Sequence, residues 1–280
     1  MLDLSSVPRS LLDVTLDVVS AVDASTPGLD PSDIMVVGAA CRDVLHAALG
    51  HSFATTATLD LDLGLALSSW DVFEEVAGRF PRAGDTGIRY QIAGWTVDLL
   101  PFGAVEDPEG VVDPPTRREP VSVWAFEEIF AASAVLELSE SLRIRIPDVP
   151  GYAAAKLGAW LDRSKWGETK DAADLALVAY WYAESSRVQD RLYETEAGNE
   201  VLVAEDLDVE RAAARLLGAD VVSTIGSKRS HELVERWPGD VELLAGSFRL
   251  GGGQLWPGNP VRRRQLVDAL TRGLGIDTQG

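Results

Sequence analysis

The spacing of hydrophobic residues divides the chain into a first half of short strands and helices and a second half of helices. Strict alternation or short apolar runs indicate strands, whereas apolar residues three and four positions apart indicate helices. In the first half the pattern predicts a helix over 8–23, a strand over 34–38, a helix over 39–49, a strand over 56–67, a helix over 68–80 and paired strands over 88–94 and 95–103. This order predicts a small α/β domain on a mixed sheet.

The pattern changes after residue 105. The stretch 106–120 holds five acidic residues and four prolines, which predicts a surface loop or linker. A short helix and a pair of strands follow, and the remaining chain has helical periods over 150–165, 169–185, 206–225 and 260–275. We therefore expect an α/β domain over 1–147 and a mainly helical domain over 148–280.

Charge and composition exclude several classes of protein. The formal net charge of −19 argues against a protein that coats nucleic acid with a broad positive surface. Cys41 is the only cysteine, so the chain forms no internal disulfide and no cysteine-built zinc site. The first residues lack the pattern of a signal peptide, and no run of about eighteen apolar residues is present. We expect a cytoplasmic protein without a membrane segment.

Candidate chemistry lies in the strand 56–67, where two aspartates stand inside a run of leucines. Asp60 and Asp62 are two positions apart, so both carboxylates project from the same face. Asp98 is a third acid within an apolar strand pattern. Carboxylates that converge from two strands form a hard oxygen site suited to Mg²⁺. Gly38, between a strand and a helix, permits the tight turn at which a helix N-terminus binds an anion.

A turn that binds phosphates, beside carboxylates that bind metal ions, can position a nucleoside triphosphate for in-line attack. The same residues also fit plainer structures. The aspartates could alternate along an exposed strand face, and Arg42 with Asp43 could form a surface pair. Lys156 and Arg163 could belong to a solvated helix stripe.

Lys170 and Asp174 have the spacing of an ordinary ion pair on a helix.

Other conspicuous side chains are expected to pack inside the protein. Cys41 is expected to be a small buried residue and not a nucleophile. Four aromatic residues at helical spacing are expected to form a core between helices: Trp160, Trp166, Trp181 and Tyr182.

Five blocks of the sequence, in this order, resemble the AbiEii-like nucleotidyltransferases. The blocks are "VVGAACRDVLHAAL", "ATLDLDLGLALSSWDVF", "WTVDLLPFGAVE", "AAAKLGAWLDR" and "KDAADLALVAYWY", and they span about residues 34–182. These bacterial proteins belong to the polymerase-β-type nucleotidyltransferase superfamily, and many are toxins of toxin–antitoxin or phage-defence pairs. The resemblance implies a nucleotidyltransferase-like α/β lobe followed by a helical lobe.

The resemblance also implies an activity. It implies Mg²⁺-dependent transfer of a nucleoside monophosphate from an NTP to a tRNA or protein acceptor, with release of pyrophosphate. A cognate antitoxin would be a further partner, and no membrane is involved. The region from about residue 190 onward has no counterpart in the resemblance.

Carried over to this chain, the resemblance gives roles to individual residues. Asp60 and Asp62 would bind Mg²⁺, and Asp98 would complete the cluster or activate the acceptor hydroxyl. Lys156 would face the phosphates, with Asp171 or Asp174 orienting it or acting as a base. The nucleotide-binding residues would be Gly38, Ala39, Arg42, Thr58 and Arg163. Ala39 stands where the superfamily has a serine, so the phosphate contact there would come from backbone amides alone.

Two other functions stay open. A tRNA-processing enzyme of the CCA-adding kind also has a glycine turn followed by Arg-Asp and a strand with two aspartates. The interval from Gly38 to Asp60 is longer than in that group, and no basic tail follows. A non-catalytic binding protein could keep the same fold, although loss of Asp60, Asp62 or Lys156 would be the expected sign of it, and all three are present.

Overall fold

The structure is a computed structural model of the chain, in which residues 4–56, 60–115, 119–238, 241–251 and 253–276 are described. The chain divides into two compact units, Met1–Asp148 and Val149–Gly280. Each unit has its own hydrophobic core. The two units are described separately below.

The first unit is built on a six-stranded sheet with the order β3-β4-β2-β1-β8-β7. The strands are β1 (Ile34–Val37), β2 (Asp60–Leu67), β3 (Arg89–Ile92), β4 (Trp95–Gly103), β7 (Ala134–Glu137) and β8 (Arg143–Ile146). Strand β2 runs parallel to β4, and β1 runs parallel to β8, whereas the other neighbours are antiparallel. The prediction of an α/β unit on a mixed sheet is confirmed.

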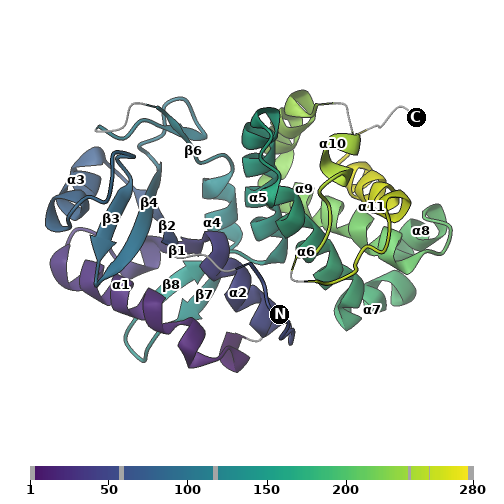
Figure 1. Cartoon of the computed structure of the whole chain (residues 1–280), viewed down its shortest axis with the longest axis horizontal. Helices are drawn as coiled ribbons and strands as arrows, with labels where there is room; N and C mark the ends of the chain where they lie inside the picture. Colours follow the sequence, from purple (N-terminus) through teal and green to yellow (C-terminus); the bar gives the residue numbers. More distant parts are fainter. Residues whose placement is uncertain (1–3, 57–59, 116–118, 239–240, 252, 277–280) are drawn as a thin grey trace. The chain divides into compact units, whose positions relative to one another are not determined.

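In the described part of this unit, four α-helices accompany the sheet: α1 (Asp13–Ser25), α2 (Gly38–Ala48), α3 (Trp70–Arg79) and α4 (Phe126–Ala132). Short 3-10 turns lie at Leu4–Ser6, Arg9–Leu11 and Pro31–Asp33. The helix expected over 8–23 is thus a 3-10 turn followed by α1. Figure 1 shows α1 and α3 on one side of the strands and α4 on the other.

The two faces of β2 and β4 differ in polarity. The odd-numbered residues of both strands are almost all buried and apolar, among them Leu61, Leu63 and Val97. On the opposite face, Phe102 near the end of β4 packs against Phe126 and Phe130 of α4, with ring centroids 5.7 and 5.5 Å apart. Asp60, Asp62 and Asp98 lie closer to the starts of the two strands than this aromatic cluster does.

The described part of the acidic stretch 106–120 contains regular structure that its composition does not predict. It contains strand β5 (Val111–Val112), which pairs with β6 (Val121–Ser122), and Val112 is fully buried. The carboxylate of Glu106 accepts hydrogen bonds from two backbone N–H groups, those of Gly103 and Gly110. One of the acids therefore holds the turn together, a role that composition alone does not reveal.

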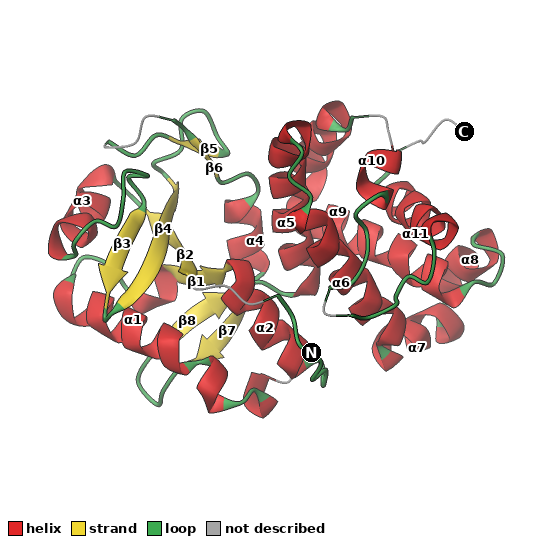
Figure 2. Cartoon of the chain, viewed as in Figure 1, coloured by secondary structure: helices red, strands yellow, loops and turns green. Residues whose placement is uncertain are grey.

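The described elements of the second unit are all helical (Figure 2). They are α5 (Val149–Arg163), a 3-10 turn (Ser164–Trp166), α6 (Lys170–Glu184), α7 (Ser186–Glu194), α8 (Glu196–Ala204), α9 (Val209–Arg236), α10 (Val241–Ala245) and α11 (Pro260–Gly273). The four predicted helices are present as α5, α6, α9 and α11. Helix α9 continues eleven residues beyond the predicted end at 225, across a kink at Gly226, where φ is 72° and ψ is 175°.

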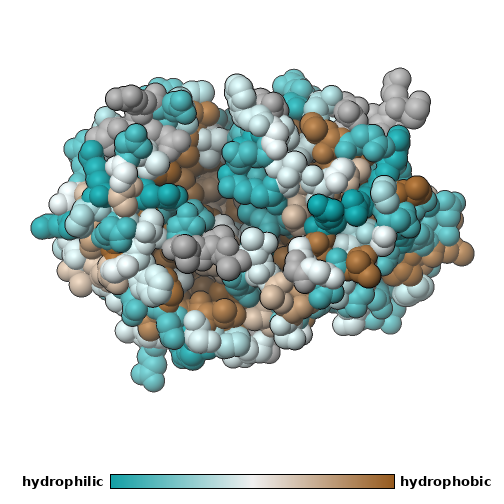
Figure 3. All heavy atoms as spheres, viewed as in Figure 1, coloured by the Kyte–Doolittle hydropathy of each residue, from teal (hydrophilic) through white to brown (hydrophobic). Residues whose placement is uncertain are grey.

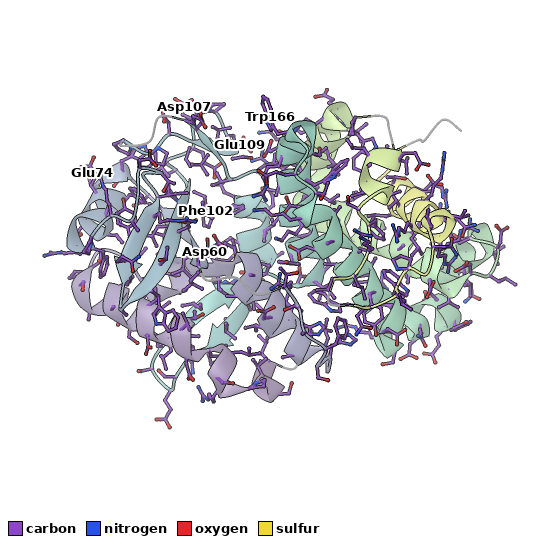
Figure 4. The ribbon with its side chains drawn as sticks, viewed as in Figure 1. Asp60, Glu74, Phe102, Asp107, Glu109 and Trp166 are labelled. Atoms are coloured by element: carbon purple, nitrogen blue, oxygen red, sulfur yellow. The ribbon has the colours of Figure 1, made fainter. Side chains whose placement is uncertain are left out.

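The aromatic residues expected in the core of this unit are buried with one exception. Trp160, Trp181 and Tyr182 are at most 7 % exposed, whereas Trp166 is 79 % exposed. The expectation for Trp166 is wrong because α5 ends at Arg163, so Trp166 no longer follows the helical face (Figure 4). In the first unit, Cys41 is buried, as expected of a packed residue.

Polar and apolar side chains both reach the surface, and the exposed large hydrophobic residues include Trp95, Trp166 and Leu255. The face seen in Figure 3 is largely hydrophilic, with small separate hydrophobic patches. Within the described part of the chain, no helix combines the length and the apolar character needed to cross a membrane.

Candidate functional site

Three aspartates lie on one face of the sheet because of the pairing between β2 and β4. In the parallel register, Asp62 is the neighbour of Asp98, and Asp60 is the neighbour of Thr96. Residues in register on neighbouring strands project from the same face, as do Asp60 and Asp62, two positions apart on one strand. Figure 4 shows Asp60 on the side of the sheet where Phe102 lies. The predicted convergence of the carboxylates is therefore present in the strand pairing.

Arg89 of β3 compensates two of these carboxylates. Its Nε and Nη2 donate hydrogen bonds of 2.7 Å to the two carboxylate oxygens of Asp98. Its Nη2 also donates a 2.9 Å hydrogen bond to Oδ2 of Asp60. The hydrogen bonds to Asp98 are the main reason that the pKa of Arg89 is raised above its ordinary value. A guanidinium thus occupies the place of a counter-cation, where the sequence predicts a metal ion.

The short turn between β3 and β4 is the feature of the sequence from which the pairing of Arg89 with Asp98 can be predicted. Ala93 and Gly94 form its two-residue turn, and both have positive φ, 52° and 87°. A two-residue turn fixes the register of a hairpin. Counting outward from the pair Ile92–Trp95 places Arg89 directly opposite Asp98, as the structure has it.

Asp62 lies beside the N-terminus of α2. Gly38, the first residue of this helix, has φ of 62°, and a Cβ added there would collide with the Asp62 carboxylate. The N-cap residue, Val37, makes no side-chain cap hydrogen bond. A negative charge near a helix N-terminus is favourable, because the first backbone N–H groups carry partial positive charge. Asp62 thus lies beside the helix N-terminus and also within the electrostatic reach of Arg89.

The other residues expected near the nucleotide in this unit have mixed positions. Ala39 is buried in the first turn of α2. Arg42 is only 4 % exposed and donates hydrogen bonds to Asp43 and to the backbone carbonyl of Thr56. Arg42 therefore fastens α2 to the segment before β2. The pair with Asp43 is present, at 2.9 Å, but Arg42 is buried and does not lie at the surface. Thr58 lies outside the described residues.

The three carboxylates have the chemistry of metal ligands, but the positive charge of Arg89 disfavours a metal ion beside them. Their oxygens are the ligands that Mg²⁺ prefers. Nevertheless, among the residues that the structure describes, no three His, Cys, Asp or Glu side chains are grouped closely enough to hold an ion. The hydrogen bonds of Asp60 and Asp98 are directed at Arg89. A metal ion at this face would have to compete with that guanidinium.

A second group of candidate residues lies in the second unit, between α5 and α6. The Nζ atom of Lys156 lies 2.5 Å from Oδ2 of Asp174 and 3.7 Å from Oδ1 of Asp171. Arg163 also approaches Asp171, with its Nη2 3.0 Å from the carboxylate. The four residues form one charged cluster, and the alternative of a solvated stripe is wrong for Lys156, whose side chain is 15 % exposed.

Asp171 is at the centre of this cluster. Its side chain is 1 % exposed, and burial raises the pKa of its carboxyl, while Lys156 and Arg163 act against this rise. The ionised form of Asp171 therefore depends on its two cationic neighbours. Asp174 pairs with Lys156, and the Nζ atom of Lys170 lies 4.0 Å from the carboxylate of Glu168.

Comparison with known proteins gives no significant match to any protein-family model, any curated protein or any solved structure. The chemistry of the two clusters and the strand pairing are therefore the observations on which a function can be proposed.

Proposed function

We propose that the protein is a Mg²⁺-dependent nucleotidyltransferase that moves a nucleoside monophosphate from an NTP to a tRNA or protein acceptor, as the toxin of a toxin–antitoxin pair. The observation that carries this proposal is the placement of Asp60, Asp62 and Asp98 on one sheet face, with Asp62 beside the turn at Gly38. The resemblance to AbiEii-like nucleotidyltransferases supplies the reaction class and the acceptors.

In this proposal the aspartates are the metal ligands. A bound Mg²⁺ would supply charge neutralisation of the triphosphate and would orient it for in-line displacement. Asp60 is more open to solvent than Asp98, because the two side chains are 37 % and 14 % exposed. Asp98 has both oxygens engaged by Arg89, which suits a fixed ligand better than a base that must accept a proton.

The N-terminus of α2 is the proposed binding site for the phosphates. Its first backbone N–H groups follow the turn at Gly38, and a helix N-terminus favours anions. Ala39 offers no hydroxyl group, so the backbone would make the contact. A side chain at position 38 would push against Asp62, so glycine there serves the turn and the carboxylate together.

One observation favours a second candidate, a non-catalytic binding protein on the same fold. Arg89 already compensates Asp60 and Asp98, so this face needs no metal ion for its stability. A protein without catalytic activity could keep the carboxylates for that structural reason. Binding of Mg²⁺ with an NTP distinguishes the two candidates.

The test of the proposal is the thermal stability of the full chain with and without Mg²⁺ and each NTP. Ligand binding to the folded state raises Tm. We expect one or more NTPs to raise Tm only in the presence of Mg²⁺, and we expect the double variant Asp60→Asn, Asp62→Asn to lose this shift. The matched control is Asp71→Asn, at an exposed position of α3, which should keep it. A full shift in the double variant would contradict the proposed site.

A further inference from the structure

Arg89 is the charged residue of the carboxylate face for which the proposed function has no role. It lies on β3, opposite Asp98, and its guanidinium contacts both β2 and β4 carboxylates. Its side chain is 35 % exposed, so the guanidinium has room to move toward solvent. When no metal is bound, the guanidinium of Arg89 compensates the charges of the carboxylates. It repels a divalent cation that approaches the same oxygens.

The contacts of Arg89 are unequal. Asp98 receives two parallel hydrogen bonds of 2.7 Å, the bidentate arrangement that is strongest for an arginine and a carboxylate. Asp60 receives one hydrogen bond of 2.9 Å and is the more exposed of the two acids. The link to Asp60 is therefore the one that breaks first.

We infer that Arg89 is an internal counter-cation that a divalent metal ion must displace from Asp60, while Arg89 keeps Asp98 in position. This inference rests on the proposed function, because it concerns the same carboxylates. Arg89 acts on the metal site through Asp60 and Asp98 and is thus a positioning residue. It sets how tightly the face binds metal, and it compensates the charges of Asp60 and Asp98 when no metal is bound.

Titration calorimetry with Mn²⁺ on the full chain tests the inference without any measurement of catalysis. We expect Arg89→Gln to bind Mn²⁺ about tenfold more tightly than the unaltered protein, because a positive charge within a few ångströms of the metal has been removed. The same variant without metal should have a lower Tm, because two carboxylates are left to repel one another.

The matched control is Arg143→Gln. Arg143 is also a cross-strand arginine of this sheet, paired with Glu137 at 3.1 Å, and its removal changes the net charge by the same amount. We expect its Mn²⁺ affinity to equal that of the unaltered protein. Equal gains in both variants would attribute the effect to net charge and would overturn the inference.

A second variant, Arg89→Lys, keeps a positive charge between the carboxylates. It is the variant to measure if Arg89→Gln does not fold. An ammonium cannot form the bidentate contact, so we expect an Mn²⁺ affinity between those of the unaltered protein and Arg89→Gln. If the unaltered protein binds Mn²⁺ and the Arg89 variants bind it equally or more weakly, the inference is wrong while the proposed metal site stands. If none of the proteins binds Mn²⁺, the proposed metal site fails and the inference fails with it.

Discussion

Gly38 is the residue at which backbone conformation and side-chain chemistry constrain the candidate site together. Its φ of 62° is unfavourable for residues with a Cβ, and a Cβ there would collide with Asp62. We expect Gly38→Ala to lower the free energy of unfolding by about 2–4 kcal/mol, the strain of the backbone plus that of the collision. Urea denaturation measures this loss.

The control for Gly38→Ala is Gly50→Ala. Gly50 also has positive φ, 82°, but a Cβ there would have no atom within 4 Å. We expect it to lose only the backbone part, about 1–2 kcal/mol. Equal losses in the two variants would show that the contact between Gly38 and Asp62 does not constrain the turn.

Lys156 illustrates how the structure changes a prediction about a single residue. The resemblance gives it a role at the phosphates, which predicts a large loss of turnover and a modest loss of stability in Lys156→Ala. Its contacts with Asp174 and the buried Asp171 predict a larger loss of stability, about 2–4 kcal/mol, because removal of one partner leaves a buried charge poorly compensated.

The control for Lys156→Ala is Lys170→Ala. The Lys170 side chain is 67 % exposed and lies 4.0 Å from Glu168, so its removal should change the free energy of unfolding by less than about 0.5 kcal/mol. Denaturation of both variants gives the comparison. A loss below about 1 kcal/mol in Lys156→Ala would mean that Arg163 alone supports Asp171.

At the scale of elements, the hairpin of β3 and β4 positions Arg89 against Asp98. Ala93 occupies the first turn position with φ of 52°, which asparagine adopts at lower cost than alanine. We therefore expect Ala93→Asn to raise the free energy of unfolding by about 0.5–1 kcal/mol. Ala104→Asn is the control at an exposed site without positive φ, and it should give no gain. Equal effects would contradict the role of the turn.

The contact between helix α2 and the segment after it should make the free energy of unfolding depend on pH. His46 of α2 is 5 % exposed and lies 3.1 Å, through Nε2, from the Phe53 carbonyl. Burial is the main cause that lowers its pKa below 6.5. Because the unfolded chain binds the proton more readily, this contribution to stability is complete above pH 6.5 and is lost as the pH falls toward the folded pKa.

The measurement is urea denaturation at several pH values from about 7.5 to 5.5, around the ordinary pKa of histidine. We expect His46→Gln to weaken the decline in stability, whereas His231→Gln, at an exposed position of α9, should leave it unchanged. An identical decline in all three proteins would exclude His46 as its source.

Some elements could be predicted from the sequence, and others could not, for physical reasons. Helices α2 and α6 and strands β2 and β4 have strong periodic patterns, and their positions agree with the prediction to within a few residues. Helices α7 and α8 are nine residues each, and each buries only two residues, so few apolar positions mark them in the sequence. The three aspartates can be predicted because acids are rare inside apolar strands. The role of Arg89 depends on the hairpin register, so the residues around it in the sequence do not indicate it.

At the scale of the whole molecule, the net charge of −19 affects how strongly a charged acceptor binds. A nucleic acid would meet general repulsion and would need a local basic surface, so its binding should weaken steeply with added salt. Lys156 and the aspartates of β2 lie in different compact units, and the sequence resemblance is what associates them in one proposed reaction.

The central claim is transfer of a nucleoside monophosphate, and labelled nucleotides test it most directly. The protein is incubated with Mg²⁺, a whole-cell extract and each NTP labelled at the α- or the γ-phosphate, and RNA and protein are then separated. The account predicts that the α label enters one of these fractions, that the γ label does not, and that the double variant Asp60→Asn, Asp62→Asn transfers none. Transfer of the γ label, or equal α labelling by the double variant, would contradict it.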